Sequence, residues 1–276
     1  MFLLNTEFFF DSEVPHGNIV GPSIKVPTPD EYDVKARSIA NFIDKYQANL
    51  VALVEVENRD CVELVQKNLN HKEFWQIISL EGRDTFTGQD VVLLSKFPVI
   101  KETITNFPDQ WSNYTYQGKN KLVRPSKVLG CELSIHGQSV YLIVAHLISK
   151  RSDNDAKRLG QAKVLRQQSI RALEKDQNMI LVGDFNDTPN TPVLQELRGK
   201  LDKWAESIQT AENIPLSNRY TYVYQSQKQL LDHIPLSSSL QDEFLSVPVE
   251  RRCQIFDTKN LSDHKGMIVR LKLNDF

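Results

Sequence analysis

The sequence predicts an α/β fold in which helices pack on mixed β-sheets, and three observations lead to this prediction. Residues 49–56, "NLVALVEV", and 180–182, "ILV", are continuous or nearly continuous aliphatic runs, which are typical of strands buried on both faces. Apolar side chains recur at helical spacing after a capping box that begins at Thr28. His136-Gly137-Gln138 separates two apolar runs and indicates a hairpin, so antiparallel pairs are expected beside strands that helices connect.

The N-terminal half alternates strands and helices. The opening "MFLLNTEFFF" predicts a first strand, and a polar loop over residues 11–27 follows it. Thr28 is the expected N-cap of a helix, with Pro29 at its first position and Glu31 reaching back to the cap. The apolar face of that helix consists of Ile39, Ala40, Ile43 and Tyr46. Beyond the buried strand, the expected elements are a helix over 61–69 and strands over 75–79 and 91–94.

The C-terminal half begins with the hairpin, whose strands cover 128–135 and 139–146. A charged helix over 153–174 leads into the strand that ends in "ILVGDFND". The alternating segment "SDHKGMIVRLKL" predicts a final strand. Because no linker or low-complexity tract interrupts this pattern, we expect a single domain over residues 1–276.

The composition is that of a globular protein, with 40% hydrophobic and 25% charged residues, and no segment is apolar enough to cross a membrane. Cys61, Cys131 and Cys253 are widely spaced and predict neither a disulfide scaffold nor a cysteine zinc site. The opening residues lack the basic region of a signal peptide, so we expect a cytoplasmic location. We also expect a monomer without a membrane partner. The net charge of −2 gives no indication of nucleic-acid binding. It does not exclude such binding either, because carboxylates that bind a cation lower the formal charge.

Polar side chains recur where aliphatic strands end, which is where layered α/β proteins usually build their sites. The set comprises Asn5, Glu55, Glu57, His146, Asp184, Asn186 and Asp232. One such residue alone would be interpreted as an ordinary loop residue, but the repetition indicates a site. Carboxylate and amide oxygens suit Mg²⁺ or Mn²⁺ rather than Zn²⁺. A hard cation beside neutral imidazoles is what hydrolysis of a phosphate ester requires.

Segments spread over nearly the whole chain resemble, in order, the endonuclease/exonuclease/phosphatase superfamily, which includes deoxyribonuclease I-like enzymes. They are "LNTEFFFD", "VALVEVEN", "DVVLLSKFP", "RPSKVLGCEL", "LIVAHLISK", "ILVGDFNDTP", "YTYVYQSQKQLLDHIPLS" and "LSDHKGMIV". Several look most similar to bacterial extracellular nucleases. The resemblance implies a four-layered α/β sandwich, with two mixed β-sheets packed face to face and helices outside, and a phosphodiesterase that depends on Mg²⁺ or Mn²⁺.

The same resemblance implies roles for single residues. The implied metal ligands are Asn5, Glu55 and Asp263, and the implied catalytic residues are His146, Asp184, Asn186, Asp232 and His264. Asp184 and Asn186 would position or deprotonate the attacking water and hold the phosphate. Asp232 would orient His264 and Asp90 would orient His146, while the choice of acid and base between the two imidazoles stays open.

Further residues carry weaker expectations. Phosphate binding is expected of Arg124, Asn186 and His264. For Arg124 and for Lys127, which follows it in the same segment, a solvated loop is an equally good interpretation. An aromatic cluster in the loop before Arg124, which either stacks on bases or anchors the loop, comprises Trp111, Tyr114 and Tyr116. Basic residues that either follow a phosphate backbone or solvate a helix are Lys150, Arg151, Lys157 and Arg158. We expect His233 to be structural and Asp187 to cap the turn at Thr188-Pro189.

Three functions stay open at this point. The first is a metal-dependent nuclease that hydrolyses DNA, with RNA as a further candidate substrate. The second is hydrolysis of a small phosphorylated substrate such as an inositol phosphate or a phospholipid head group, since the same catalytic set serves both. The third is a non-catalytic binding protein of the same fold, which the complete catalytic set disfavours. Ala145 and Val54 replace the Asn and Gln that are usual in related nucleases, and this puts the substrate preference in doubt.

Overall fold

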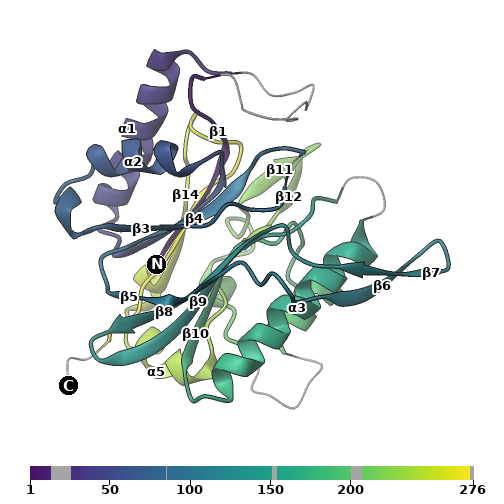
Figure 1. The fold of residues 1–276 in the computed structure, drawn as a ribbon. Coiled ribbons are helices and arrows are strands. Elements are labelled where there is room, and N and C mark those ends of the chain that lie inside the picture. Colours follow the sequence, from purple (N-terminus) through teal and green to yellow (C-terminus); the bar gives the residue numbers. More distant parts are fainter. Residues whose placement is uncertain (14–25, 85, 151–153, 200–206, 274–276) are drawn as a thin grey trace.

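The computed structural model describes residues 1–13, 26–84, 86–150, 154–199 and 207–273. Two β-sheets lie in the centre, and helices cover their outer faces (Figure 1). This arrangement confirms the predicted α/β class with two mixed sheets. Within the described part of the chain, no helix combines the length and hydrophobicity needed to span a membrane.

The first sheet has six strands in the order β14-β15-β1-β2-β4-β3. Their bounds are Phe2–Phe9 for β1, Leu50–Val56 for β2, Gln76–Ser79 for β3, Asp90–Ser95 for β4, Cys253–Phe256 for β14 and Gly266–Val269 for β15. β1 and β2 run parallel, with Asn5 opposite Val54, and the other pairs are antiparallel. The aliphatic runs of β1 and β2 are buried on both faces, as their composition predicts.

The second sheet has five strands in the order β13-β10-β9-β8-β5. Their bounds are Val99–Thr105 for β5, Lys127–Ile135 for β8, Gln138–His146 for β9, Asn178–Asp184 for β10 and Asp232–His233 for β13. β8 and β9 form the predicted hairpin, and its turn places His136 and Gly137 at φ angles of 49° and 81°. β9 and β10 run parallel, with His146 opposite Asp184.

The main core lies between the two sheets. Leu3, Ala52 and Leu93 from the first sheet belong to the same buried cluster as Leu142 and Val182 from the second. The four longest helices pack on the outer faces: α1 (Pro29–Lys45) and α2 (Arg59–Lys67) on the first sheet, α3 (Asp155–Leu173) and α4 (Pro192–Arg198) on the second. The order of layers is therefore helices, sheet, sheet, helices (Figure 1).

Local sequence signals appear where they are predicted. The Thr28 N–H donates to the Glu31 carboxylate at 2.8 Å, and the Glu31 N–H donates to the Thr28 hydroxyl at 3.3 Å, which completes the capping box of α1. Asp153, the predicted start of α3, lies outside the described residues. Gly183 has a φ of 151°, and a Cβ atom there would lie 1.7 Å from the carbonyl oxygen of Ala145, so the strand needs glycine at this position.

Two short hairpins lie beside the main sheets: β6 (Ser112–Tyr116) with β7 (Lys119–Val123), and β11 (Tyr222–Tyr224) with β12 (Gln227–Gln229). The first projects at the right of Figure 1 and packs on α3, where the sequence predicts only a loop. Its strands are mostly polar, so they lack the apolar alternation of a half-buried strand. The remaining short helices are η1 (Lys72–Phe74), η2 (Thr210–Asn213), η3 (Ser238–Leu240), α5 (Gln241–Leu245) and α6 (Val249–Arg252).

The topology brings polar residues from both sheets to one place. Each sheet contains one parallel pair, β1 with β2 and β9 with β10, and in each pair both strands end at the same edge. β10 contacts both β1 and β2 across the core. Residues at the carboxyl ends of these four strands can therefore meet between the sheets.

Candidate active site

Glu55 lies near the carboxyl end of β2, where the pairing with β4 is irregular. Its φ of 63° is a left-handed conformation that is costly for a residue with a side chain, and such strain tends to occur at functional sites. Glu55 Oε1 accepts a hydrogen bond from Asn5 Nδ2 at 3.1 Å. Oε2 accepts from Gln89 Nε2 at 2.9 Å and from the Phe8 N–H at 3.2 Å. Three donors therefore fix the orientation of this carboxylate.

Asn5 joins the two sheets. Its Nδ2 atom also donates to Asp184 Oδ2 at 3.0 Å, and its Oδ1 atom accepts from the Glu7 N–H at 3.0 Å. The side chains of Asn5 and Asp184 are almost completely buried. Burial and the nearby Asp232 carboxylate raise the pKa of Asp184 to about 7. These surroundings favour the protonated form of Asp184, so its carboxyl takes up a proton more readily than that of an ordinary aspartate.

Asp232 holds His264. Asp232 Oδ2 lies 2.7 Å from His264 Nδ1, and this leaves Nε2 directed toward Asp184, with 3.9 Å between Nε2 and Asp184 Oδ2. Burial lowers the pKa of His264, but the Asp232 carboxylate outweighs that effect and the pKa rises to about 10. The structure thus joins the pair that the family resemblance implies, and the Asp232 carboxylate favours the protonated form of His264.

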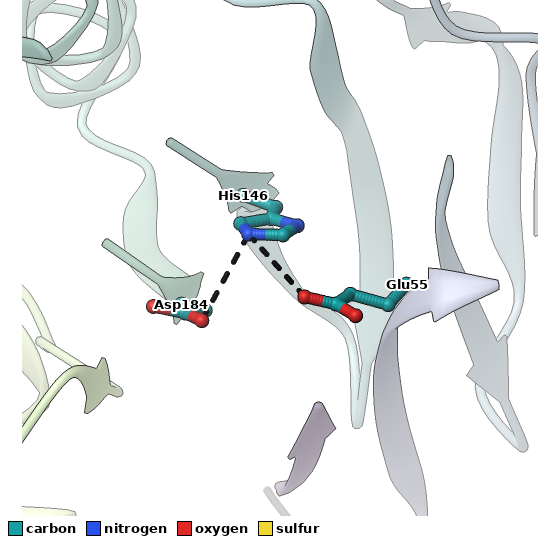
Figure 2. A group of neighbouring side chains, drawn as sticks. All are labelled: Glu55, His146 and Asp184. Carbon is teal, nitrogen blue, oxygen red and sulfur yellow. Dashed lines mark ion pairs between the residues drawn. The ribbon is translucent and has the colours of Figure 1, made fainter. Parts of the chain in front are cut away.

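His146 approaches Asp184 from the end of β9. Figure 2 shows its imidazole beside the carboxylates of Glu55 and Asp184, with Nε2 3.8 Å from Glu55 Oε1 and 3.8 Å from Asp184 Oδ2. Burial lowers the pKa of His146 well below its usual value, and the positive charge of Lys127 lowers it further. His146 is therefore neutral, in contrast to His264.

Two groups of side chains have the composition and spacing of a metal site: Glu55 with His146 and Asp184, and Asp184 with Asp232 and His264. In each group, one possible ligand atom per residue lies within 4.8 Å of the others. Within the described part of the chain, buried His146 Nδ1 and Asp232 Oδ1 have no hydrogen-bond partner. Such atoms are costly to bury alone, so they fit a site that receives an ion, water or substrate. The oxygen-rich donor set fits Mg²⁺ or Mn²⁺.

Asp263 lies beside these groups. Its backbone N–H donates to Glu7 Oε2 at 2.8 Å. Partial burial raises the pKa of the Asp263 carboxyl, His264 opposes this, and the nearby carboxylates of Glu7 and Glu55 raise the pKa further. Repulsion among these carboxylates is relieved by a cation, so Asp263 is placed where it could support a metal bound at Glu55.

Asn186 and Asp187 face in different directions after β10. The Asn186 N–H donates to Asp184 Oδ1 at 2.8 Å, and Asn186 Nδ2 donates to the carbonyl oxygen of Leu147 at 2.9 Å. Asn186 therefore ties the loop to the end of β9 next to the Asp184 carboxylate. Asp187 Oδ1 accepts from the Thr188 N–H at 3.0 Å, which is the turn cap that the sequence predicts.

Arg158 and His233 both bind Asp187, in the loop after β10. Arg158 is only 1% exposed and its Nε donates to Asp187 Oδ2 at 3.1 Å, so neither the phosphate-tracking nor the helix-solvating interpretation of this residue is correct. His233 Nε2 lies 2.9 Å from the Asp187 carbonyl oxygen, and its ring stacks on Phe185. These contacts give His233 a structural position. Arg151, from the same basic group as Arg158, lies outside the described residues.

The structure does not bring Asp90 to His146. Asp90 Oδ1 accepts from the Gly82 N–H at 2.8 Å, whereas His146 Nδ1 has no partner among the described residues. Burial, together with the nearby Glu81 carboxylate, raises the pKa of Asp90 to about 7. The expectation that Asp90 orients His146 is therefore wrong. Asp90, at the start of β4, instead binds the backbone of Gly82 in the loop between β3 and β4.

Arg124 and Tyr116 also differ from their expected positions. The Arg124 guanidinium lies 4.2 Å from the ring centroid of Trp111, and it donates to the carbonyl oxygen of Pro108. Tyr116 lies in hairpin β6–β7, where Lys121 Nζ is 4.7 Å from the ring centroid. Among the described contacts, none joins Arg124 or Tyr116 to the buried catalytic group. Packing of the hairpin on α3 accounts for this position.

Gln89 and Lys127 are site residues that sequence reasoning missed or left undecided. Gln89 Nε2 binds Glu55, and Gln89 Oε1 accepts from Lys127 Nζ at 2.9 Å. Lys127 is buried, pairs with Asp84 at 3.1 Å, and stands opposite His146 in the sheet. The available signal was a polar residue at or just before the beginning of a strand. When two neighbouring strands are antiparallel, the beginning of one lies beside the end of the other, so Gln89 and Lys127 lie beside the strand ends that carry Glu55 and His146.

Comparisons with known proteins agree with this architecture. The model of the endonuclease/exonuclease/phosphatase family matches residues 12–272. Among solved structures, a humanized TDP2 of D. rerio carrying 14 mutations is 19% identical, with a TM-score of 0.60 over 96% of this chain and 95% of that chain. The mannosyl-6-phosphatase Bt3783 of Bacteroides thetaiotaomicron is 13% identical, with a TM-score of 0.60 over 97% of each chain.

A third structure, D. rerio TDP2 complexed with a single-strand DNA product, is 16% identical, with a TM-score of 0.58 over 97% of this chain and 96% of that chain. At these identities the structures show a shared fold alone. A search of curated protein sequences gave no match. Members of the matching family hydrolyse phosphoester bonds and depend on divalent metal ions. The match over residues 12–272 establishes that the chain belongs to the endonuclease/exonuclease/phosphatase family.

Proposed function

We propose that this protein is a divalent-metal-dependent nuclease that hydrolyses phosphodiester bonds of DNA, with RNA as a second substrate to be tested. One observation carries the proposal: Asp184 Oδ2 lies 3.0 Å from Asn5 Nδ2, 3.8 Å from His146 Nε2 and 3.9 Å from His264 Nε2. A carboxylate, an amide and two imidazoles from both sheets thus surround one point. This is a set that can bind a phosphate and move protons around it.

Glu55 and Asn5 would hold the metal ion, with Asp263 beside them. When bound, Mg²⁺ or Mn²⁺ supplies charge compensation for the phosphate and lowers the pKa of water. Asp184, whose pKa is about 7, accepts a proton from the attacking water as the new P–O bond forms. The opposite P–O bond breaks, and the leaving oxygen takes a proton from His264, which Asp232 keeps oriented. Neutral His146 donates a hydrogen bond to the phosphate.

The surroundings of the site favour a nucleic-acid substrate. Tyr224 on hairpin β11–β12 is 53% exposed. The half-buried Tyr222 of the same hairpin has its ring centroid 4.7 Å from that of His264. Exposed aromatic rings can stack on bases of either DNA or RNA. D. rerio TDP2, a protein of the same fold, has been solved with a single-strand DNA product, which is consistent with this choice of substrate.

The proposal is tested with purified protein, supercoiled plasmid DNA and a single-stranded RNA, each incubated with Mg²⁺, Mn²⁺ or EDTA. We expect nicked plasmid with either metal and intact plasmid with EDTA. Release of inorganic phosphate from an inositol phosphate is measured in parallel. An intact plasmid and intact RNA under every metal condition, together with rapid phosphate release, would show that the substrate is a small phosphoester instead.

A further inference from the structure

Two lysines flank an aromatic ring close to His264. Lys265 Nζ lies 3.8 Å from the ring centroid of Tyr220, and Lys228 Nζ lies 4.5 Å from the same centroid. Lys265 is the residue after His264, and its N–H donates to the carbonyl oxygen of Thr221 at 2.7 Å. These contacts attach the segment before β11 to the loop that carries His264. Positive charge therefore begins next to the catalytic centre and extends to hairpin β11–β12.

Lys228 also lines a cavity of about 770 Å³ among the described residues. Thr188, Pro189 and Asn190 form part of its wall, and they follow directly on the loop that contains Asn186. Other parts of the wall include Arg198 and Arg219. The cavity is therefore connected to the candidate active site by the loop after β10 and by the contact of Lys228 with Tyr220.

The cavity has the charge of an anion site. Arg219 Nε donates to the carbonyl oxygen of Ile214 at 2.9 Å, and Lys228 Nζ donates to that of Ser217 at 3.1 Å. Because carbonyl oxygens are neutral, these bonds orient the two side chains without cancelling their charges. In the part of the chain that the structure describes, no ion pair joins Arg219 or Lys228 to a carboxylate. Glu212, the acidic residue of the wall, lies 3.8 Å from Arg198.

A substrate with a single phosphate would not need this arrangement. The group around Asp184 would bind one phosphate, whereas the cavity offers further cations, which Lys265 and Lys228 connect to His264 through Tyr220. A polynucleotide presents phosphates at regular intervals along its backbone, so cations at successive distances from the active site can bind it. The catalytic centre, the two lysines at Tyr220 and the cationic cavity follow one another, so they could contact successive parts of one polynucleotide strand.

We propose that one strand of the polynucleotide substrate runs from the active site across Tyr220 and into the cavity, where Arg219 and Lys228 bind a backbone phosphate remote from the scissile one. This inference rests on the proposed nuclease function and specifies its substrate as an oligonucleotide of several residues. The cavity then contributes to binding of long substrates and has no part in the hydrolysis of short ones.

The experiment compares Arg219→Met/Lys228→Met with a control variant, Arg37→Met/Lys101→Met, which removes the same two charge types from exposed positions on α1 and β5. Binding of a fluorescent single-stranded oligonucleotide, about 12 nucleotides long to span a typical site, is measured by anisotropy over a range of salt concentrations. All proteins carry Asp184→Asn to prevent cleavage. We expect the cavity variant to bind about tenfold more weakly and its log–log salt slope to be shallower by about one to two, whereas the control keeps both values.

Hydrolysis of a dinucleotide, measured with Asp184 restored, should be the same in the cavity variant and the wild type. Single Lys228→Met and the charge-preserving Lys228→Arg guard against a folding defect: the first should weaken oligonucleotide binding and the second should retain it. Wild-type affinity in the cavity variant, or equal losses in cavity and control variants, would overturn the inference while DNA cleavage by the wild type upholds the proposed function. A wild type that cleaves no nucleic acid would overturn both.

Discussion

Asp232 Oδ2 lies 2.7 Å from His264 Nδ1, and this contact directs the other ring nitrogen of His264 toward Asp184. The two residues come from different strands and segments, β13 and the loop before β15. The Asp232 carboxylate raises the pKa of His264 and so favours its cationic form, whereas burial lowers the pKa of His146 and favours its neutral form. The Nδ1 atom of His146 has no hydrogen-bond partner among the described residues. The two imidazoles are therefore assigned different protonation states by their surroundings.

Asp232→Asn should lower kcat by about 10²–10⁴-fold, because it removes the charge that keeps His264 protonated and oriented. Asp90→Asn is the matched control: Asp90 is a buried carboxyl with a raised pKa, but it binds the Gly82 N–H and not a catalytic imidazole. The control should leave kcat close to its wild-type value. Steady-state kinetics on a fluorogenic oligonucleotide measure both, and a similar loss in the two variants would contradict the assignment.

Gln89→Leu should raise the Mg²⁺ concentration needed for half-maximal activity by about tenfold. The substitution keeps the approximate side-chain size but removes the Nε2 donor to Glu55 Oε2 and the Oε1 atom that accepts the hydrogen bond from Lys127 Nζ. Activity should recover at saturating Mg²⁺, because Glu55 itself is intact. Titration of Mn²⁺ by calorimetry gives a second reading. An unchanged metal affinity would show that Gln89 does not support the Glu55 carboxylate.

Gly183→Ala should lower the free energy of unfolding by about 3 kcal/mol or more, because its Cβ atom would meet the Ala145 carbonyl oxygen at 1.7 Å. Gly137→Ala is the control, since Gly137 also has a positive φ, of 81°, but nothing lies within 4 Å of the position that a Cβ atom would take there. It should cost about 1 kcal/mol. Urea denaturation followed by circular dichroism measures the difference, and equal costs would contradict the close approach of β9 and β10.

Burial lowers the pKa of His233, although its contact with the Asp187 carbonyl oxygen opposes this. As the pH falls through about 6.5, the unfolded chain takes up a proton at this residue before the folded protein does, so stability decreases down to the folded pKa. In His233→Asn, the free energy of unfolding should therefore depend less steeply on pH below about 6.5 than in the wild type.

His71 provides the control for that measurement, because its side chain is 74% exposed. The variant His71→Asn should keep the wild-type pH dependence, whatever its absolute stability. If His233→Asn and His71→Asn give the same slope as the wild type, His233 is not held neutral by the fold.

Much of the site could be predicted because its residues share one sequence signal. Asn5, Glu55, His146 and Asp184 each interrupt or follow an aliphatic run near the end of a strand, and strands that run parallel bring such ends together. The buried runs also predicted the α/β class. Because the local pattern and the topology agree here, the sequence alone was sufficient to predict the α/β class and the position of these four residues.

The failures have a common physical origin in tertiary contacts, which local sequence patterns do not specify. Gln89 and Lys127 lie at the beginnings of antiparallel strands, and only the sheet register places them beside Glu55 and His146. Arg124 was expected at the phosphate, but its neighbour Trp111 and the packing of β6–β7 on α3 determine its position. Asp90 satisfies a backbone N–H group in a nearby loop, a choice that no spacing rule reveals.

The central claim is that the group around Asp184 hydrolyses phosphodiester bonds with a divalent metal ion. The most direct test is cleavage of supercoiled plasmid with Mg²⁺ or Mn²⁺ by the wild type, Asp184→Ala and His264→Ala, with folding of each protein checked by thermal denaturation. We predict metal-dependent nicking by the wild type, and loss of nicking in both variants with little change in folding. Cleavage by both variants at the wild-type rate, or nicking by the wild type that EDTA leaves unchanged, would contradict the account.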